Sequence, residues 1–147
     1  MLSIEKKNKE TNFTNNDIET YVAFLYQHLE QYGDKAEDIT KAIHYALGID
    51  NKPGGAVFIA KDETKQIVGI SVVLDTMMEG FIPEHILVYI AADSRVRGNG
   101  IGSQLIEFIK KETKGSIALH VDKDNPAQNL YERMGFEKKY IEMRLSK

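Results

Sequence analysis

The residues whose types and spacing best suit chemistry form a glycine-rich turn, Arg95-Val96-Arg97-Gly98-Asn99-Gly100-Ile101-Gly102. The turn lies between an apolar run at 85–92, typical of a strand, and a run from 101 to 114, typical of a helix. Glycine lets the backbone approach a ligand closely and adopt positive φ. The start of a helix leaves N–H groups unpaired and carries partial positive charge. This turn therefore predicts an anion site, most often for a phosphate, to which two arginines add charge.

The composition bounds the class of protein that carries this turn. The 147 residues predict one domain over 1–147, and 42% of them are hydrophobic, which is enough for a core. A net charge of −3 argues against nucleic-acid binding, and the lack of cysteine excludes disulfides, thiolate metal sites and cysteine nucleophiles. The sequence shows no signal peptide and no apolar run long enough for a membrane span. We expect a cytoplasmic protein that needs no metal.

Hydrophobic periodicity predicts alternating strands and helices that must position the turn. The expected strands are residues 3–6, 56–60, 67–74, 85–92, 116–121 and 136–145, with 56–60 and 67–74 forming a hairpin. The expected helices are residues 16–32, 36–47, 101–114 and 126–134. This order predicts a mixed α/β or α+β sheet.

A second block of residues indicates which cofactor carries the anion that the glycine-rich turn would bind. It reads Asn125-Pro126-Ala127-Gln128-Asn129-Leu130-Tyr131-Glu132-Arg133-Met134-Gly135-Phe136, in which Asn and Pro are suited to start a helix. Together with the turn, this block resembles the GNAT superfamily of N-acetyltransferases, whose acyl-coenzyme A signature is Arg or Gln, two residues, Gly, one residue, then Gly or Ala. The signature fits from Arg95 or from Arg97, and we choose Arg97 because the helix then follows the last glycine directly.

The resemblance implies a mostly antiparallel central sheet with one splayed strand pair, flanked by helices. It implies that acetyl-coenzyme A is the acyl donor and that pantetheine pairs with the strand backbone before the turn. The cofactor-binding residues that it implies are Ile90, Ala91, Ala92, Arg97, Gly98, Asn99, Gly100, Ile101, Gly102, Asn125 and Tyr131.

The resemblance also implies a catalytic acid, Tyr131, which would protonate the leaving thiolate. A phenol of pKa about 10 can do this for a thiol of about 8.5. The spacing of Tyr131 alone favours a core aromatic beside Leu130, and it is the resemblance that favours the acid role. Many relatives carry an acid inside the strand before the turn, but this chain has Val88 and Tyr89 there. For the catalytic base we rank Glu84 first, and His85, Asp75 and Glu79 are the other candidates.

The predicted function is transfer of an acetyl group to a primary amine by direct attack of that amine on the thioester. The alternative is a coenzyme A-binding regulatory or scaffolding domain without turnover. A dinucleotide site fits less well, because Ser103 replaces the third glycine, and a P-loop lysine is missing. The acceptor, a small molecule or a peptide amine, stays open. An exposed C-terminal strand such as 139–144 would allow a homodimer.

Overall fold

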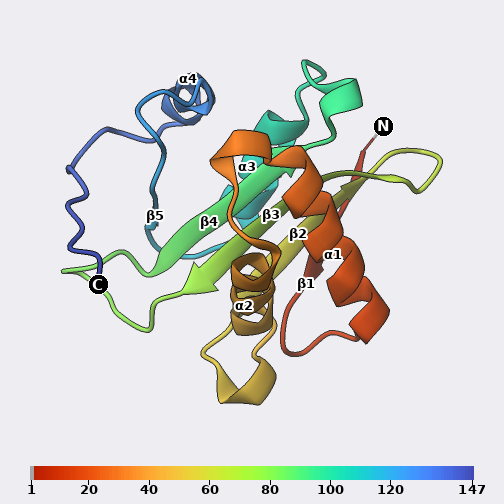
Figure 1. Ribbon diagram of the computed structural model, residues 1–147, viewed down its shortest axis with the longest axis horizontal. Coiled ribbons are helices and arrows are strands. Elements are labelled where there is room, and N and C mark those ends of the chain that lie inside the picture. Colours follow the sequence, from red (N-terminus) through yellow and green to blue (C-terminus); the bar gives the residue numbers. More distant parts are fainter. Residues whose placement is uncertain (1) are drawn as a thin grey trace.

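The computed structural model describes residues 2–147, which form one sheet with helices on both faces (Figure 1). The strands are β1 (Ser3–Lys7), β2 (Gly55–Lys61), β3 (Ile67–Asp75), β4 (His85–Ala92) and β5 (Ile117–Leu119). The α-helices are α1 (Asn15–His28), α2 (Ala36–Ala46), α3 (Ile101–Glu112) and α4 (Ala127–Arg133). The described residues also form three short 3-10 helices: η1 (Glu30–Tyr32), η2 (Ile49–Asn51) and η3 (Ser94–Val96).

The five strands lie in the order β1-β2-β3-β4-β5, so neighbours in sequence are neighbours in the sheet. The first four are antiparallel, and β2 with β3 forms the expected hairpin. Strand β5 is parallel to β4 and pairs with it only from His85↔Ile117 to Leu87↔Leu119. Within residues 2–147 no strand pairs with the rest of β4, residues 88–92, on that side, and we call this segment the free edge of β4. The predicted mixed α/β fold is confirmed.

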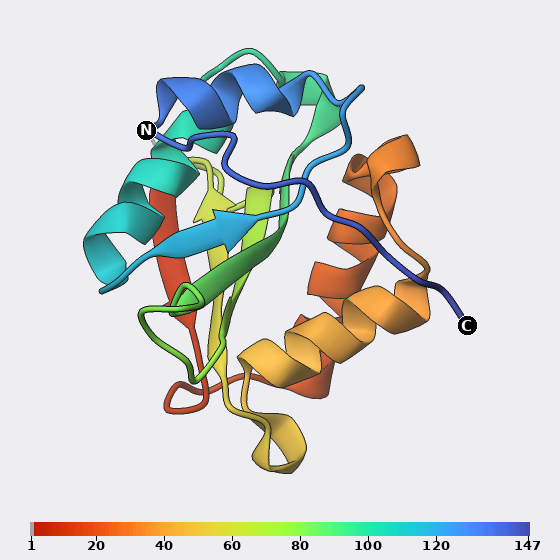
Figure 2. The same cartoon turned by 90° about the vertical axis from the view of Figure 1, so that its left-hand side faces the viewer.

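Each face of the sheet carries its own hydrophobic core, and Figure 2 shows helices on both sides of the sheet. Helices α1 and α2 cover one face, and their fully buried Leu25, Ile39 and Ile43 pack on it. Helix α3 covers the other face through Leu105 and Ile109, which are also buried. The sheet is therefore held from both sides, and this fixes β4 relative to α3.

An irregularity in β4 marks the point where the strand leaves β5. Val72 pairs with Tyr89 but Val73 pairs with Leu87, so Val88 is an extra residue in β4. Such a bulge bends a strand and changes the face to which the following side chains point. Leu87 belongs to the α3 core, whereas Val88 and Tyr89 both contact the α1–α2 core. The bulge therefore turns Tyr89 toward α1 and α2.

The first predicted helix is divided in the structure. The expected helix over 16–32 is α1 followed by η1, because Glu30 adopts φ 55° and interrupts the regular turn. The helix begins after Thr14, whose hydroxyl accepts from Asp17 N while the Asp17 carboxylate accepts from Thr14 N. This capping box closes the helix start.

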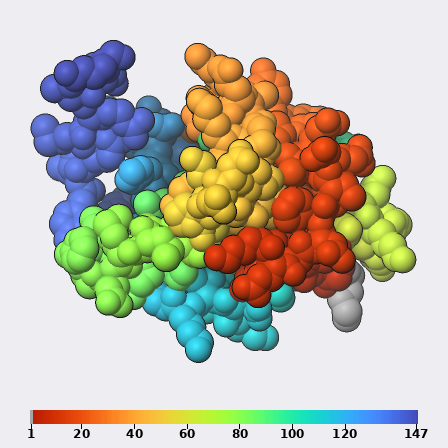
Figure 3. All heavy atoms as spheres, turned by 90° about the horizontal axis from the view of Figure 1, so that it is seen from below, coloured from red at the N-terminus to blue at the C-terminus, as the bar shows by residue number. Residues whose placement is uncertain are grey.

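The C-terminal strand predicted over 136–145 is wrong. Residues 136–147 belong to no strand, and the side chains of Tyr140, Ile141, Met143 and Leu145 are at least 79% exposed. A strand needs a neighbour to complete its hydrogen bonds, and β5 offers only three residues instead of the predicted 116–121. Figure 3 shows the end of the chain standing away from the body of the molecule.

Candidate active site

The glycine-rich turn has the backbone geometry that an anion site requires. Gly98 has φ 89°, and Gly100, the cap residue of α3, has φ 76°, a region that favours glycine. Apart from its two chain neighbours, no residue in 2–147 has an atom within 4 Å of a Cβ placed on Gly98, so its φ, not crowding, explains the glycine. Among residues 2–147, the N–H groups of 98–103 donate to no backbone carbonyl or side chain. The turn therefore presents free donors at the positive end of α3.

Gly102 lies inside α3 and contacts α4. A Cβ there would come within 2.9 Å of the end of the Leu130 side chain, which would have to shift. The glycine thus leaves room for Leu130 of α4 against the first turn of α3. This contact brings the second sequence block, 125–136, beside the turn.

The two arginines of the turn have different partners. Arg97 donates to the Glu30 carboxylate at 2.7 Å and to the His28 carbonyl at 2.5 Å, which ties the turn to the end of α1. Arg95 donates to the buried Asp93 carboxylate through Nε and Nη2, at 3.0 and 2.6 Å. Arg97 is held by an exposed ion pair, which is weak in water. The Glu30 carboxylate can therefore be displaced at little cost, whereas the hydrogen bond to the His28 carbonyl holds the other end of the guanidinium.

Asp93 should make the protein sensitive to acid. Hydrogen bonds from Arg95 and its charge hold the pKa of the Asp93 carboxyl well below its usual range. A carboxyl with a lowered folded pKa contributes stability above its unfolded pKa of about 3.9, and this is lost as the pH falls through the folded value. We expect Asp93→Asn to lower stability to urea at pH 7 and to flatten its decline below about pH 4. Parallel acid curves for the two proteins would contradict this.

Asn125 lies two residues before α4, whose N-cap is Pro126 instead of the expected Asn125, and Tyr131 lies within the helix. Asn125 Oδ1 accepts from Ala127 N at 2.9 Å, so its side chain holds the start of the helix. Tyr131 is 9% exposed and its ring meets Phe136 edge-on, with centroids 5.9 Å apart. Burial raises the pKa of Tyr131 to about 12.

The Tyr131 hydroxyl is open for a ligand. This hydroxyl has no hydrogen-bond partner within residues 2–147. Every fully buried side-chain nitrogen or oxygen in that range does have a partner, so the Tyr131 oxygen is not fully buried. The ring is therefore buried while its oxygen reaches solvent. A protonated phenol with an unused O–H is suited to donate a proton.

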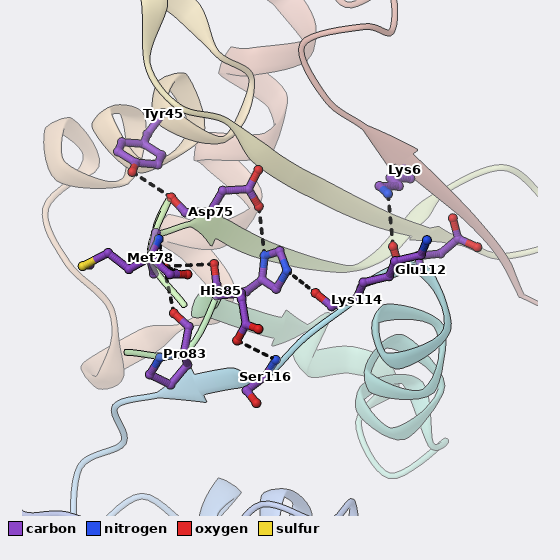
Figure 4. Close-up of polar contacts among 11 residues, drawn as sticks. Lys6, Tyr45, Asp75, Met78, Pro83, His85, Glu112, Lys114 and Ser116 are labelled. Carbon is purple, nitrogen blue, oxygen red and sulfur yellow. Dashed lines mark hydrogen bonds and ion pairs between the residues drawn. The ribbon is translucent and has the colours of Figure 1, made fainter. Parts of the chain in front are cut away.

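The candidate bases gather at the opposite end of β4. His85 Nδ1 lies 2.9 Å from Asp75 Oδ1 and its Nε2 donates to the Lys114 carbonyl at 2.6 Å, so both ring nitrogens are occupied (Figure 4). The Glu84 carboxylate accepts from Ser116 N at 3.1 Å, and this hydrogen bond lowers the pKa of Glu84. These contacts join β3, β4 and the chain leading into β5.

Distance along the strand also separates these groups from the free edge. Glu84 precedes Tyr89 by five residues, which is about 16 Å in a strand. Glu79 lies still farther along the chain, in the loop before β4. The base role of Glu84 stays a prediction, and its lowered pKa and its place weigh against it.

The structure adds a carboxylate that the sequence did not single out. Tyr89 Oη donates to Asp34 Oδ2 at 2.5 Å, although the two residues are 55 positions apart. Asp34 belongs to the connection between α1 and α2, residues 29–35. Neither residue stands in a recognisable motif, so no sequence signal pointed to the pair. The bulge at Val88 and the break of the first helix create it together.

Two shallow hollows lie on the surface near these elements. One, of about 240 Å³, is lined by the α4 start and includes Asn125, Gln128 and Glu132. The other, of about 530 Å³, lies between α1 and α2 and includes Val22, Tyr26 and Thr40. Within residues 2–147 no group of His, Asp and Glu side chains has the geometry of a metal site. No helix in that range has the length and apolarity to cross a membrane.

Solved structures share this fold over nearly the whole chain. A possible acetyltransferase from Clostridium difficile 630 has a TM-score of 0.70 at 16% identity, covering 99% of this chain and 97% of its own. An aminoglycoside N-acetyltransferase in complex with CoA has a TM-score of 0.69 at 18% identity, covering 100% and 95%. A transcriptional regulator from Bacillus halodurans C-125 has a TM-score of 0.68 at 22% identity, covering 99% of both chains. These similarities define an acetyltransferase-like fold.

The family follows from the sequence itself. Residues 53–138 match the acetyltransferase (GNAT) domain family, and this span contains both the glycine-rich turn and the block at 125–136. The chain therefore belongs to the GNAT acetyltransferase family, as the resemblance predicted. A comparison of the sequence with curated proteins gave no match.

Proposed function

We propose that the protein transfers an acetyl group from acetyl-coenzyme A to a primary amine. The observation that carries the proposal is the set of free N–H donors at 98–103, at the start of α3 and beside Arg97. Donors without acceptors, open space at Gly98 and a guanidinium in a weak ion pair fit a pyrophosphate. Family membership supports acyl-coenzyme A as the donor.

The free edge of β4 fits the pantetheine arm. Ile90, Ala91 and Ala92 pair with β3 on one side, and no strand of the described part of the chain pairs with them on the other. Their outward backbone groups can therefore hydrogen-bond an amide-containing chain. Asn125 stands at the start of α4, and we propose that its side chain contributes to the same binding.

The reaction needs two proton movements once the amine is neutral, and an acceptor that arrives as an ammonium ion first releases one proton to solvent. The neutral amine attacks the thioester carbonyl carbon, the C–N bond forms and the C–S bond breaks. Tyr131 donates its phenolic proton to the departing sulfur, and the bound nitrogen loses its extra proton to solvent. As a base, Glu84 would take the proton only through water, because it lies about 16 Å along the strand from Tyr89 at the free edge of β4.

Two measurements test this proposal. Calorimetric titration with acetyl-coenzyme A should show binding at micromolar to low millimolar ligand. Thiol release in the presence of primary amines should then show turnover. No binding at millimolar ligand would overturn the proposal, and tight binding without turnover on any amine would favour the coenzyme A-binding domain.

We propose a small molecule or a peptide with a free amine as the acceptor. A cytoplasmic location stays a prediction. A homodimer also stays a prediction, but residues 139–144, which were expected to pair as a strand across it, form no strand. Size-exclusion chromatography with light scattering tests the homodimer directly.

A further inference from the structure

The bulge in β4 leads to a carboxylate beside the free edge. Because Val88 is an extra residue, Tyr89 faces α1 and α2, where its side chain is 9% exposed. The β3 residue Ser71 donates to the Tyr89 carbonyl at 2.8 Å and fixes the backbone there. The Tyr89 hydroxyl then donates to Asp34. Burial, and after it this hydrogen bond, raise the pKa of Tyr89, so it stays a donor.

The Asp34 carboxylate is only partly used. Tyr89 occupies Oδ2, while no Lys, Arg or His in residues 2–147 pairs with Asp34. The residue is solvent-exposed, so Oδ1 can meet a ligand. A carboxylate held at one oxygen by a buried phenol is fixed in direction without losing its charge.

The connection that carries Asp34 is held at two further points. Glu30 pairs with Arg97 of the glycine-rich turn. Tyr32 Oη donates at 3.3 Å to the carbonyl of Asp124, in the chain that follows β5. The 29–35 connection thus contacts the turn, the free edge of β4 and the loop before α4, the three segments that would surround the thioester.

We propose that Asp34 binds the acceptor as an ammonium ion and that Tyr89 is the positioning residue for Asp34. This inference rests on the proposed function. An amine of pKa about 10.4 is almost entirely protonated at pH 7, so the species that arrives is a cation. β4 itself has Val88 and Tyr89, and no carboxylate, at these positions. Tyr89 instead recruits the carboxylate from the 29–35 connection, and this selects cationic primary amines as the substrate class.

The test compares two charge removals on neighbouring residues. Wild type is first screened with 1,4-diaminobutane, lysine ethyl ester, glycinamide and kanamycin, and the amine with the highest kcat/KM is kept. For Asp34→Asn we expect KM for this amine to rise by about tenfold or more, with the acetyl-coenzyme A Kd within about twofold of wild type. The matched control is Glu37→Gln, which removes the same charge from exposed α2 surface and should change KM by less than about twofold.

Tyr89→Phe separates positioning from folding. This variant keeps the ring in the core and removes only the hydroxyl, so we expect a rise in amine KM of several-fold, smaller than that of Asp34→Asn. Asp34→Glu should recover part of the affinity. An unchanged amine KM in Asp34→Asn, or an equal rise in amine KM in Glu37→Gln, overturns the role of Asp34 and leaves the proposed acetyl transfer standing. If wild type binds acetyl-coenzyme A but acetylates none of the amines, the proposed function falls, and this role with it.

Discussion

Replacing Tyr131 by phenylalanine is expected to lower kcat by about a hundredfold or more, the usual contribution of a general acid. The ring would keep its contact with Phe136, so the fold of α4 should survive. Only the hydroxyl, which has no partner within residues 2–147, is lost. A hundredfold corresponds to about 2.7 kcal/mol of transition-state stabilisation. Steady-state rates of thiol release measure it directly.

The affinity for acetyl-coenzyme A distinguishes a catalytic role of Tyr131 from a role in packing. Tyr131→Phe should keep its Kd within about twofold of wild type, because a catalytic acid acts on the leaving group and adds little to ground-state binding. The matched control is Tyr26→Phe, whose side chain on α1 is 61% exposed and should leave the rate unchanged. A normal kcat in Tyr131→Phe would show that Tyr131 is a core aromatic only.

The pH profile gives an independent check on the same residue. With its pKa raised to about 12, the Tyr131 phenol is protonated across the neutral and mildly basic range. Its acid form is therefore present below that pKa and is lost only above it. Wild-type kcat/KM should show no decline that is due to Tyr131 below about pH 10.

Replacing Arg97 by alanine is expected to weaken acetyl-coenzyme A binding by about tenfold to a hundredfold. Charge-assisted hydrogen bonds contribute about 1.5–3 kcal/mol each, and every 1.4 kcal/mol is tenfold in Kd. The loss of the exposed Glu30 pair offsets little of this. Calorimetry at two salt concentrations measures the effect, and salt should weaken wild-type binding more than that of the variant.

Two neighbouring variants make the Arg97 result specific. Arg95→Ala removes the same charge, but Arg95 is held by Asp93, so Kd should change by less than about threefold. Glu30→Gln removes the competing carboxylate and should keep or tighten the affinity. If acetyl-coenzyme A affinity falls more in Arg95→Ala than in Arg97→Ala, Arg95 is the arginine that contacts the phosphate, and the signature begins at Arg95.

The turn could be predicted from sequence because its demands are local. Gly98 and Gly100 adopt positive φ, and α3 begins directly after them. Three glycines followed by a helical pattern are therefore enough to predict the geometry of the turn. The same holds for the two strands of the β2–β3 hairpin, which are joined by a short polar turn. Structure that depends only on neighbouring residues, such as this turn and this hairpin, can be recognised in a single stretch of sequence.

The rest of the site could not be predicted because it arises between distant segments. The bulge at Val88 exists only in the register of β4 against β3, and the choice of Asp34 by Tyr89 follows from it. The pairing of Arg97 with Glu30 depends on how α1 ends. The strand expected at 136–145 failed for the same reason, since alternating side chains do not supply a neighbouring strand.

The short pairing of β5 with β4 means that the molecule is not equally stable throughout. Only three residue pairs join β5 to the sheet, and neither hydrophobic core includes a buried residue of α4. Segments with few buried contacts open locally at a lower free energy than the global unfolding of the protein. Amide hydrogens of β5 and α4 should therefore exchange earlier than those of β2 and β3. A ligand that spans the free edge of β4 and α4 would slow this exchange, because its binding energy adds to the stability of the region that it closes.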